Sequence, residues 1–174
     1  METLPNETQQ SGHNLFEALQ SQLQRSVEVC NLLEALADEL PRRSLSIWRA
    51  AKLQCRNELN AHVALGRDQI VPLLIEPGHQ SELERNLVLR FGAEYRATAH
   101  RVEDLDDLLF DAVASDGTGI GSEALGYALR GHFEALRKSF DWERGILLPM
   151  IMRAQSMRDR LQRDTHDAHA RNAH

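Results

Sequence analysis

The sequence has only two cysteines in 174 residues, Cys30 and Cys55, and this scarcity excludes a disulfide framework. They are also too far apart in the sequence for the paired spacing of a zinc ribbon. We therefore expect both thiols to be reduced and buried, because an unpaired cysteine packs as a small apolar side chain. Aromatic residues make up only 5% of the chain, whereas Leu, Ala, Glu, Arg and Gln are plentiful, and this mixture favours helix over sheet.

Long hydrophobic runs are missing as well. Nowhere do the roughly 18 apolar residues of a membrane-spanning helix follow one another, and residues 1–12 lack the basic and apolar regions of a secretory signal. Basic side chains are scattered and the formal net charge is −6, so we expect no nucleic-acid partner. These absences predict a single cytoplasmic domain that has no membrane partner.

Four segments carry apolar residues at alternating steps of three and four, the spacing of one helix face. The first segment ends at Pro41, and the second starts near Ser44 and ends between Pro72 and Pro77. The inner positions predicted for these two helices are Phe16, Leu19, Leu23, Ser26, Cys30, Leu33, Ala37 and Leu40, then Trp48, Cys55, Leu59, His62, Gly66, Gln69 and Leu73. Each segment is long enough to be one helix of a bundle.

The third segment starts at a predicted capping box, in which Ser81 is followed three residues later by Glu84. A glycine-rich connection over residues 115–122 leads to the fourth segment, in which Pro149 is expected to kink or end the helix. This connection lacks the Gly-Lys-Ser/Thr of a phosphate-binding loop, so nucleotide binding is not expected. The inner positions predicted here are Val88, Phe91, Tyr95, Thr98, Val102, Leu105, Leu109 and Ala112, then Leu125, Leu129, His132, Leu136, Ser139, Glu143, Ile146 and Met150.

Short connections between four amphipathic helices predict an all-α fold, an up-down-up-down antiparallel four-helix bundle. We assign residues 1–12 to a flexible lead-in and residues 13–157 to the bundle. Residues 158–174 are polar and rich in histidine, with almost no apolar side chains, and are predicted to be a disordered tail.

Several predicted inner positions hold polar side chains where packing alone would favour apolar ones. Glu143 is the most informative, because burying a carboxylate costs several kcal/mol of folding free energy unless it is paired, hydrogen-bonded or bound to a cation. Ser139 lies four residues before it on the same helix face, and His62 and Gly66 are related in the same way. Carboxylate and imidazole ligands at this spacing build di-iron sites in four-helix bundles.

The segments 62–74 and 139–149 resemble the motif of the hemerythrin-like (HHE cation-binding) domain family, which is His-x-x-x-Glu followed by an apolar turn and proline. In both segments a proline stands ten residues after the first ligand position, at Pro72 and Pro149. Further similarity to the family lies in residues 25–37, 94–97 and 124–133, so that the resemblance covers about residues 16–153. It implies a hemerythrin-like bundle that binds iron and serves in oxygen, redox or nitric oxide sensing or in iron handling.

The ligand set departs from that of the family. Only His62 and Glu143 keep family ligands by position, and Tyr95 stands at the histidine position of the third helix. His100 is the alternative in that helix, but Tyr95 lies on the apolar stripe and His100 does not. At the other ligand positions the chain has Leu23, Gly66 and Ser139.

Two hypotheses follow from this degenerate set, and a di-iron centre is not expected under either. In the first, a single iron is held by His62, Glu143 and Tyr95, with help from Asp68 or His132, because imidazole, carboxylate and phenolate all suit iron. In the second, the same residues form a metal-free hydrogen-bonded network, and the bundle acts as a protein-interaction or regulatory module with a protein partner or as a homodimer. No Ser/His/Asp or Cys/His arrangement has the context of a nucleophile, so the sequence favours a protein that is not an enzyme.

Overall fold

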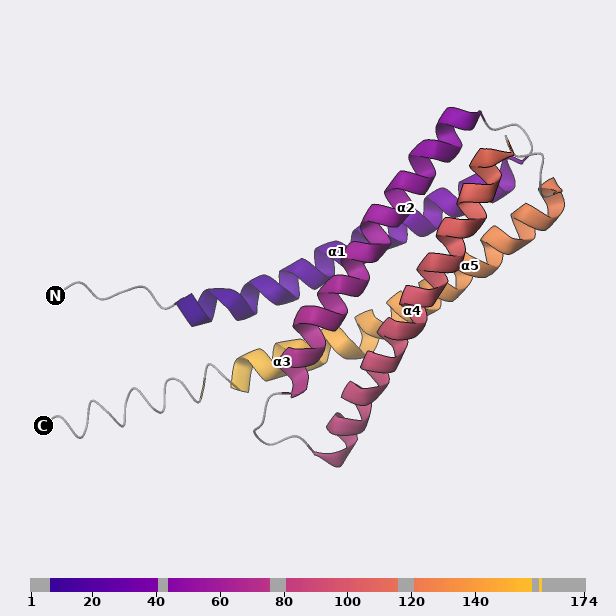
Figure 1. The fold of residues 1–174 in the computed structure, drawn as a ribbon. Coiled ribbons are helices and arrows are strands. Elements are labelled where there is room, and N and C mark those ends of the chain that lie inside the picture. Colours follow the sequence, from indigo (N-terminus) through magenta and orange to yellow (C-terminus); the bar gives the residue numbers. More distant parts are fainter. Residues whose placement is uncertain (1–6, 41–43, 76–80, 116–120, 158–159, 161–174) are drawn as a thin grey trace, which may run out of the picture.

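The computed structural model describes residues 7–40, 44–75, 81–115, 121–157 and 160, and the side chains from residue 15 onward. These residues are almost entirely helical, and none of them forms a strand. The four long helices are α1 (Glu7–Asp38), α2 (Leu45–Leu65), α4 (Glu82–Ala114) and α5 (Ser122–Trp142) (Figure 1). The predicted all-α four-helix bundle is therefore confirmed. Within the described ranges no helix is long and apolar enough to cross a membrane.

The helices are arranged in a ring in which α4 and α5 approach each other least. Helix α1 packs against α2 and α5, and α2 packs against α4 (Figure 1). Ion pairs join the end of α1 to α5: Asp38 to Arg130 and Glu34 to Arg137, with N–O distances of 2.7 and 2.6 Å. The earlier α1 residue thus pairs with the later α5 residue, as expected for antiparallel neighbours.

The ends of the chain differ in part from the prediction. Helix α1 begins at Glu7, inside the segment 1–12 that we expected to be a lead-in. Residues 1–6 lie outside the described residues, as does nearly all of the predicted tail over 158–174. The part of α1 beyond residue 14 carries the predicted apolar face into the core.

Helix α4 follows its prediction closely. The Ser81 hydroxyl accepts a hydrogen bond from the Glu84 backbone N–H, and the Glu84 carboxylate accepts one from the Ser81 backbone N–H. This is the predicted capping box, which satisfies two of the backbone donors that a helix start leaves unpaired. All eight predicted inner positions of this helix, from Val88 to Ala112, are buried.

Two widened turns interrupt the helices, and each lies just before a proline. The π turns η1 (Gly66–Ile70) and η2 (Glu143–Leu147) are closed by hydrogen bonds between residues five apart, Val71 N–H to the Gly66 carbonyl and Leu148 N–H to the Glu143 carbonyl. A proline ring clashes with the carbonyl four residues earlier, and for Pro72 and Pro149 that carbonyl belongs to the widened turn. Both helices therefore continue past their prolines, as α3 (Val71–Ile75) and over residues 148–157.

The widened turns correct the predicted inner faces. From the last residue of η1 onward the buried positions are Ile70 and Leu74 instead of Gln69 and Leu73, and from the last residue of η2 they are Leu147 and Ile151 instead of Ile146 and Met150. Each shift is one residue, because a π turn adds one residue to the helix and rotates everything after it. His132 is a separate correction: Phe133 takes the buried position, and His132 is half-buried at its flank.

The two cysteines are buried in the core, as predicted, and neither forms a disulfide. Burial raises the pKa of the Cys30 thiol and of the Cys55 thiol to about 12. Both thiols therefore stay protonated at neutral pH and pack as small apolar groups.

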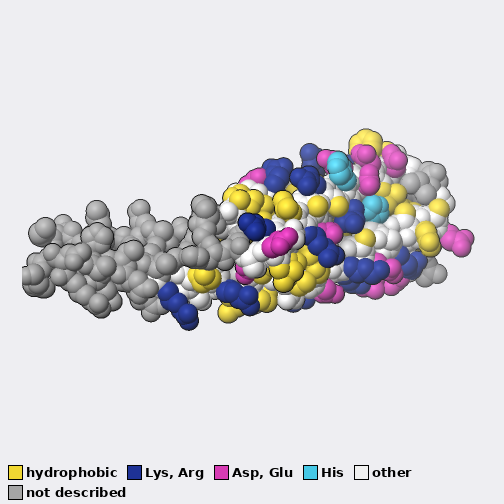
Figure 2. Space-filling model, turned by 90° about the horizontal axis from the view of Figure 1, so that it is seen from below, with side chains coloured by type: hydrophobic (Ala, Val, Ile, Leu, Met, Phe, Trp, Pro, Cys, Tyr) yellow, Lys and Arg dark blue, Asp and Glu magenta, His cyan; other side chains and the backbone are white. Residues whose placement is uncertain are grey.

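One face of the surface is shown in Figure 2. On this face lysine and arginine side chains are interspersed with aspartate and glutamate, and hydrophobic side chains lie between them. Such mixing of charges is typical of a solvated helical surface.

Candidate functional site

Three of the side chains singled out in the sequence meet at the centre of the bundle. His62 comes from α2, Tyr95 from α4, and Glu143 from the first position of η2. Their exposed fractions are 0%, 2% and 2%, so all three are shielded from solvent. Nε2 of His62 lies 3.1 Å from Oε1 of Glu143, and the Tyr95 hydroxyl donates a hydrogen bond of 2.9 Å to Oε2. Glu143 thus has the partners that a buried carboxylate requires.

The network is built around the Glu143 carboxyl group, since each of its oxygens already has a partner. Burial raises the pKa of Tyr95 above its ordinary value, and the Glu143 charge and the hydrogen bond to it act in the same direction. The phenol is therefore a neutral donor at physiological pH. The contacts of Glu143 with His62 and Tyr95 thus join α2, α4 and the start of η2 through one buried group.

Gly66 explains how Tyr95 fits into the core. A Cβ atom added at this glycine would lie 2.1 Å from both Cε1 and Cζ of the Tyr95 ring. The backbone there is ordinary right-handed helix, with φ −61° and ψ −53°, so the glycine is not required by its backbone angles. A glycine is required at position 66 because the Tyr95 ring occupies the volume that any side chain there would need.

The network has an aromatic ring beside it, and other buried polar atoms of the inner faces have no hydrogen-bond partner within the described ranges. The Phe140 ring meets the His62 imidazole edge to face, with centroids 4.9 Å apart. Several buried polar atoms form no hydrogen bond within the described part of the chain, which is uncommon for buried polar groups. Those in or beside the inner faces are His62 Nδ1, Ser26 Oγ, Thr98 Oγ1 and Ser139 Oγ.

The remaining candidate ligands lie away from the network. The His100 side chain is 79% exposed and pairs with Glu103, so Tyr95 is the residue of α4 that points into the core. Asp68 is exposed and paired with Arg67. His132 is half-buried, and burial lowers its pKa.

The donors at the centre do not fit a di-iron site. At the family ligand positions Leu23 is a buried apolar residue, Gly66 has no side chain, and Ser139 offers one hydroxyl. Among the residues that the structure describes, no group of three or more histidine, cysteine, aspartate or glutamate side chains could hold a metal ion. A third ligand would have to be Tyr95, and its burial opposes formation of the phenolate that iron prefers.

A groove between α4 and α5 is the feature that sequence reasoning missed. Glu94 and Arg101 of α4 line it together with Ser139 of α5. In the sequence, Glu94 and Arg101 are ordinary charged residues beside the apolar stripe, which are usually solvated. The one available signal was Ser139, a small polar residue at an inner position.

Comparison with known proteins finds no matching family model, no matching curated protein and no matching solved structure. The hemerythrin-like resemblance therefore stays a prediction from the motif.

Proposed function

We propose that this chain is a metal-independent four-helix bundle that acts as a binding or regulatory module and is not an enzyme. The observation that supports it most is the place of the Tyr95 ring, which fills the space beside Gly66 and donates to Glu143. The position at which a second carboxylate would enter the centre is thus taken by a protonated phenol. On this proposal His62, Tyr95 and Glu143 hold the helices in register.

Metal uptake would have to undo this packing. An ion would compete with His62 for Oε1 of Glu143 and with Tyr95 for Oε2. The proton of Tyr95 would also have to leave a site where burial and the Glu143 charge raise the pKa of the phenol. Both requirements favour the metal-free network.

The test is the effect of iron on thermal stability. The untagged full-length protein is purified, and its melting temperature is measured with EDTA and, without oxygen, with ferrous iron. A ligand stabilises the fold only if it binds the folded state, so we expect equal melting temperatures and bound iron below about 0.1 per chain. A control variant replaces His166, His169 and His174 by Gln, because histidines at the end of the chain can bind metal by themselves. An iron-dependent rise of several degrees that survives in this control would contradict the proposal.

A second candidate is a site for one iron ion, which the convergence of the three donors favours. Nε2 of His62 and the Tyr95 oxygen lie 3.1 and 2.9 Å from the Glu143 carboxylate oxygens, and donors about 3 Å apart suit adjacent bonds of about 2.1 Å to one metal. By its resemblance, such a protein would serve in oxygen, redox or nitric oxide sensing or in iron handling.

The variant Glu143→Gln distinguishes the two candidates. In an iron protein it removes the central ligand, so both the bound iron and the iron-dependent stability are lost. In a metal-free network the amide still offers Tyr95 an acceptor, and the melting temperature changes little with or without iron.

A further inference from the structure

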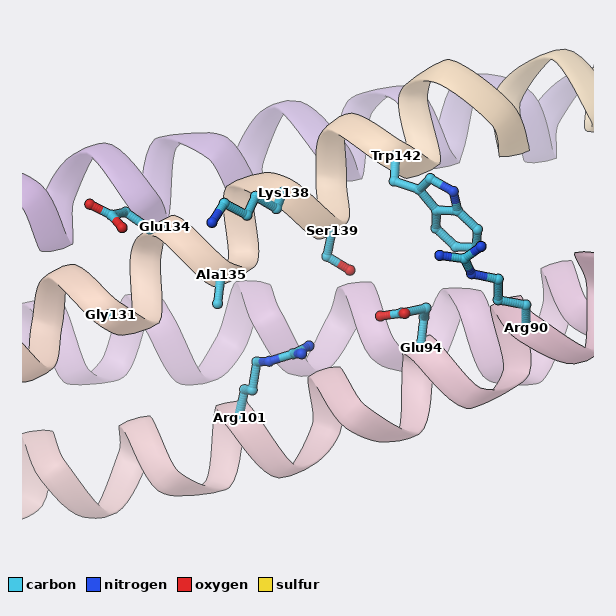
Figure 3. A pocket seen from close by; sticks show the side chains of 9 residues that line it. All are labelled: Arg90, Glu94, Arg101, Gly131, Glu134, Ala135, Lys138, Ser139 and Trp142. Atoms are coloured by element: carbon cyan, nitrogen blue, oxygen red, sulfur yellow. The ribbon is translucent and has the colours of Figure 1, made fainter.

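The groove between α4 and α5, the neighbouring long helices that contact each other least, has a volume of about 430 Å³ (Figure 3). Small residues of α5 make room for it: Gly131, Ala135 and Ser139 are four residues apart and share one helix face. A Cβ added at Gly131 would meet no atom within 4 Å. The groove is thus open space beside α5 and not a gap filled by side chains.

Three polar groups converge in this groove. Figure 3 shows the Ser139 hydroxyl pointing from α5 toward α4, and the Arg101 guanidinium and the Glu94 carboxylate extending toward each other beneath it. Ser139 is 8% exposed, and its Oγ has no hydrogen-bond partner within the described ranges. Nη1 of Arg101 is also buried and without a partner there. A buried guanidinium nitrogen and a buried hydroxyl that both lack partners indicate a position for an acceptor atom that comes from outside the chain.

Trp142 closes one end of the groove. Its ring packs against Phe91, with centroids 4.4 Å apart, and the Arg90 guanidinium lies 4.9 Å from the ring centre. These contacts hold the indole in place. The groove therefore ends at a fixed aromatic side chain next to its polar centre.

We propose that this groove binds a free α-amino acid. The carboxylate of the ligand accepts hydrogen bonds from Arg101 and Ser139, its ammonium group pairs with Glu94, and its side chain lies along Ala135 and Gly131 of α5. A zwitterion needs one cation and one anion within reach of each other, and Arg101 and Glu94 supply them on one helix. The volume of about 430 Å³ exceeds what the amino-acid backbone alone requires and leaves space for a side chain.

This inference rests on the proposed function, because it names the ligand class of the binding module, but the two fail separately. Iron uptake that depends on His62 would overturn the metal-free proposal and leave binding in the groove untouched. Absence of amino-acid binding would overturn the inference without changing the iron measurements.

The experiment is a titration of the ¹⁵N-labelled full-length protein, followed by NMR. L-alanine, L-leucine and L-glutamate are added singly, and acetate and methylamine serve as fragments that carry only one of the two charges. We expect amide shifts over residues 90–101 and 131–142 with at least one amino acid, and affinity for each fragment weaker by about tenfold or more. No shift in either segment up to about 10 mM of all three amino acids, or equal affinity for a fragment, would overturn the proposal.

Matched variants locate the site. Arg101→Gln and Glu94→Gln each remove one charge from the groove, and Arg96→Gln makes the same change on an exposed position of α4 outside it. We expect the first two to weaken binding by about tenfold or more and Arg96→Gln to leave it unchanged. Equal loss in Arg101→Gln and Arg96→Gln would show that the effect does not depend on the groove and would overturn the proposal.

A fold control accompanies these variants. If Arg101→Gln does not fold, Arg101→Lys keeps the charge but loses the planar fork, and it should still weaken binding of the carboxylate. An amino-acid affinity that is unchanged in a folded Arg101→Lys and a folded Glu94→Gln would count against the site.

Discussion

The segments 62–72 and 139–149 share one backbone design but carry different side chains at equivalent positions. In both, a helical residue is followed four positions later by the start of a π turn and ten positions later by a proline. The first segment has the imidazole of His62 and no side chain at Gly66. The second has the hydroxyl of Ser139 and the carboxylate of Glu143. The imidazole of the first segment contacts the carboxylate of the second across the bundle.

Positions 66 and 139 differ in their surroundings. At Gly66 the Tyr95 ring occupies the space that a side chain would need, so that side of the network is closed by packing. At Ser139 the hydroxyl has no partner among the described residues, and a groove begins there. The network therefore has a packed core on one side and an opening on the other.

The sharpest test of the difference between positions 66 and 139 adds a single methyl group at position 66, where the Tyr95 ring is packed. Gly66→Ala places Cβ 2.1 Å from two carbons of the Tyr95 ring, which cannot move away without breaking its hydrogen bond to Glu143. We expect a loss of about 3 kcal/mol in the free energy of unfolding, at the upper end of overpacking, even after the gain in helix propensity. Urea unfolding followed by circular dichroism measures it.

Gly92 provides the matched control for this change. It lies within α4, and a Cβ added there would meet nothing within 4 Å. Gly92→Ala should therefore stabilise the protein by about 0.5–1 kcal/mol, the ordinary gain of alanine over glycine in a helix. If both substitutions had the same effect, the Tyr95 ring would not be what requires a glycine at position 66.

A smaller effect is expected when the hydrogen bond from Tyr95 to Glu143 is removed while the aromatic ring is kept. Tyr95→Phe leaves Oε2 of Glu143 without its donor, and loss of a hydrogen bond to a buried charged group costs about 1.5–3 kcal/mol. We expect a loss near the lower end of that range at pH 7, because the phenyl ring still fills the space beside Gly66. The control is Tyr127→Phe, since Tyr127 is exposed and should contribute little.

The same variant predicts a difference in pH dependence. Burial raises the folded-state pKa of Tyr95 above the ordinary value of 10.0, so above about pH 10 the unfolded chain loses this proton while the folded chain keeps it. The wild-type protein then loses stability as the pH rises, and Tyr95→Phe lacks that part of the loss. Denaturant titrations at pH 8 and about pH 10.5 should show the stability gap between wild type and Tyr95→Phe narrowing, because the wild type falls more steeply as the pH rises. Parallel slopes would contradict a buried neutral phenol.

The helices could be predicted from the sequence to a large extent, because apolar spacing and capping are local. All of the inner face of α4 and its capping box follow from residues 81–112 alone. The predicted inner faces after α2 and α5 are wrong by one residue past Gly66 and Glu143, since a π turn adds one residue and the sequence shows only the proline that follows it.

The centre of the site was only partly accessible from the sequence. The spacing of the predicted inner positions was enough to predict that His62, Tyr95 and Glu143 face the core. In the structure the three side chains contact one another through the Glu143 carboxyl group. The reason for Gly66 could not be seen, because it depends on a ring from another helix. The groove depends likewise on the distance between α4 and α5, which is set by packing among all four helices and not by any local pattern.

The smallest expected effect is that of a substitution at Ser139, beside the groove. Ser139→Ala removes a buried hydroxyl that makes no hydrogen bond within the described ranges, so no interaction is lost, and alanine is the better helix former. The free energy of unfolding should stay within about 0.5 kcal/mol of the wild type or rise slightly. A substantial loss, measured by urea unfolding beside Gly66→Ala, would mean that the Ser139 hydroxyl contributes to the fold itself. The two sides of the network would then both be closed by the protein, and the contrast between position 66 and position 139 would disappear.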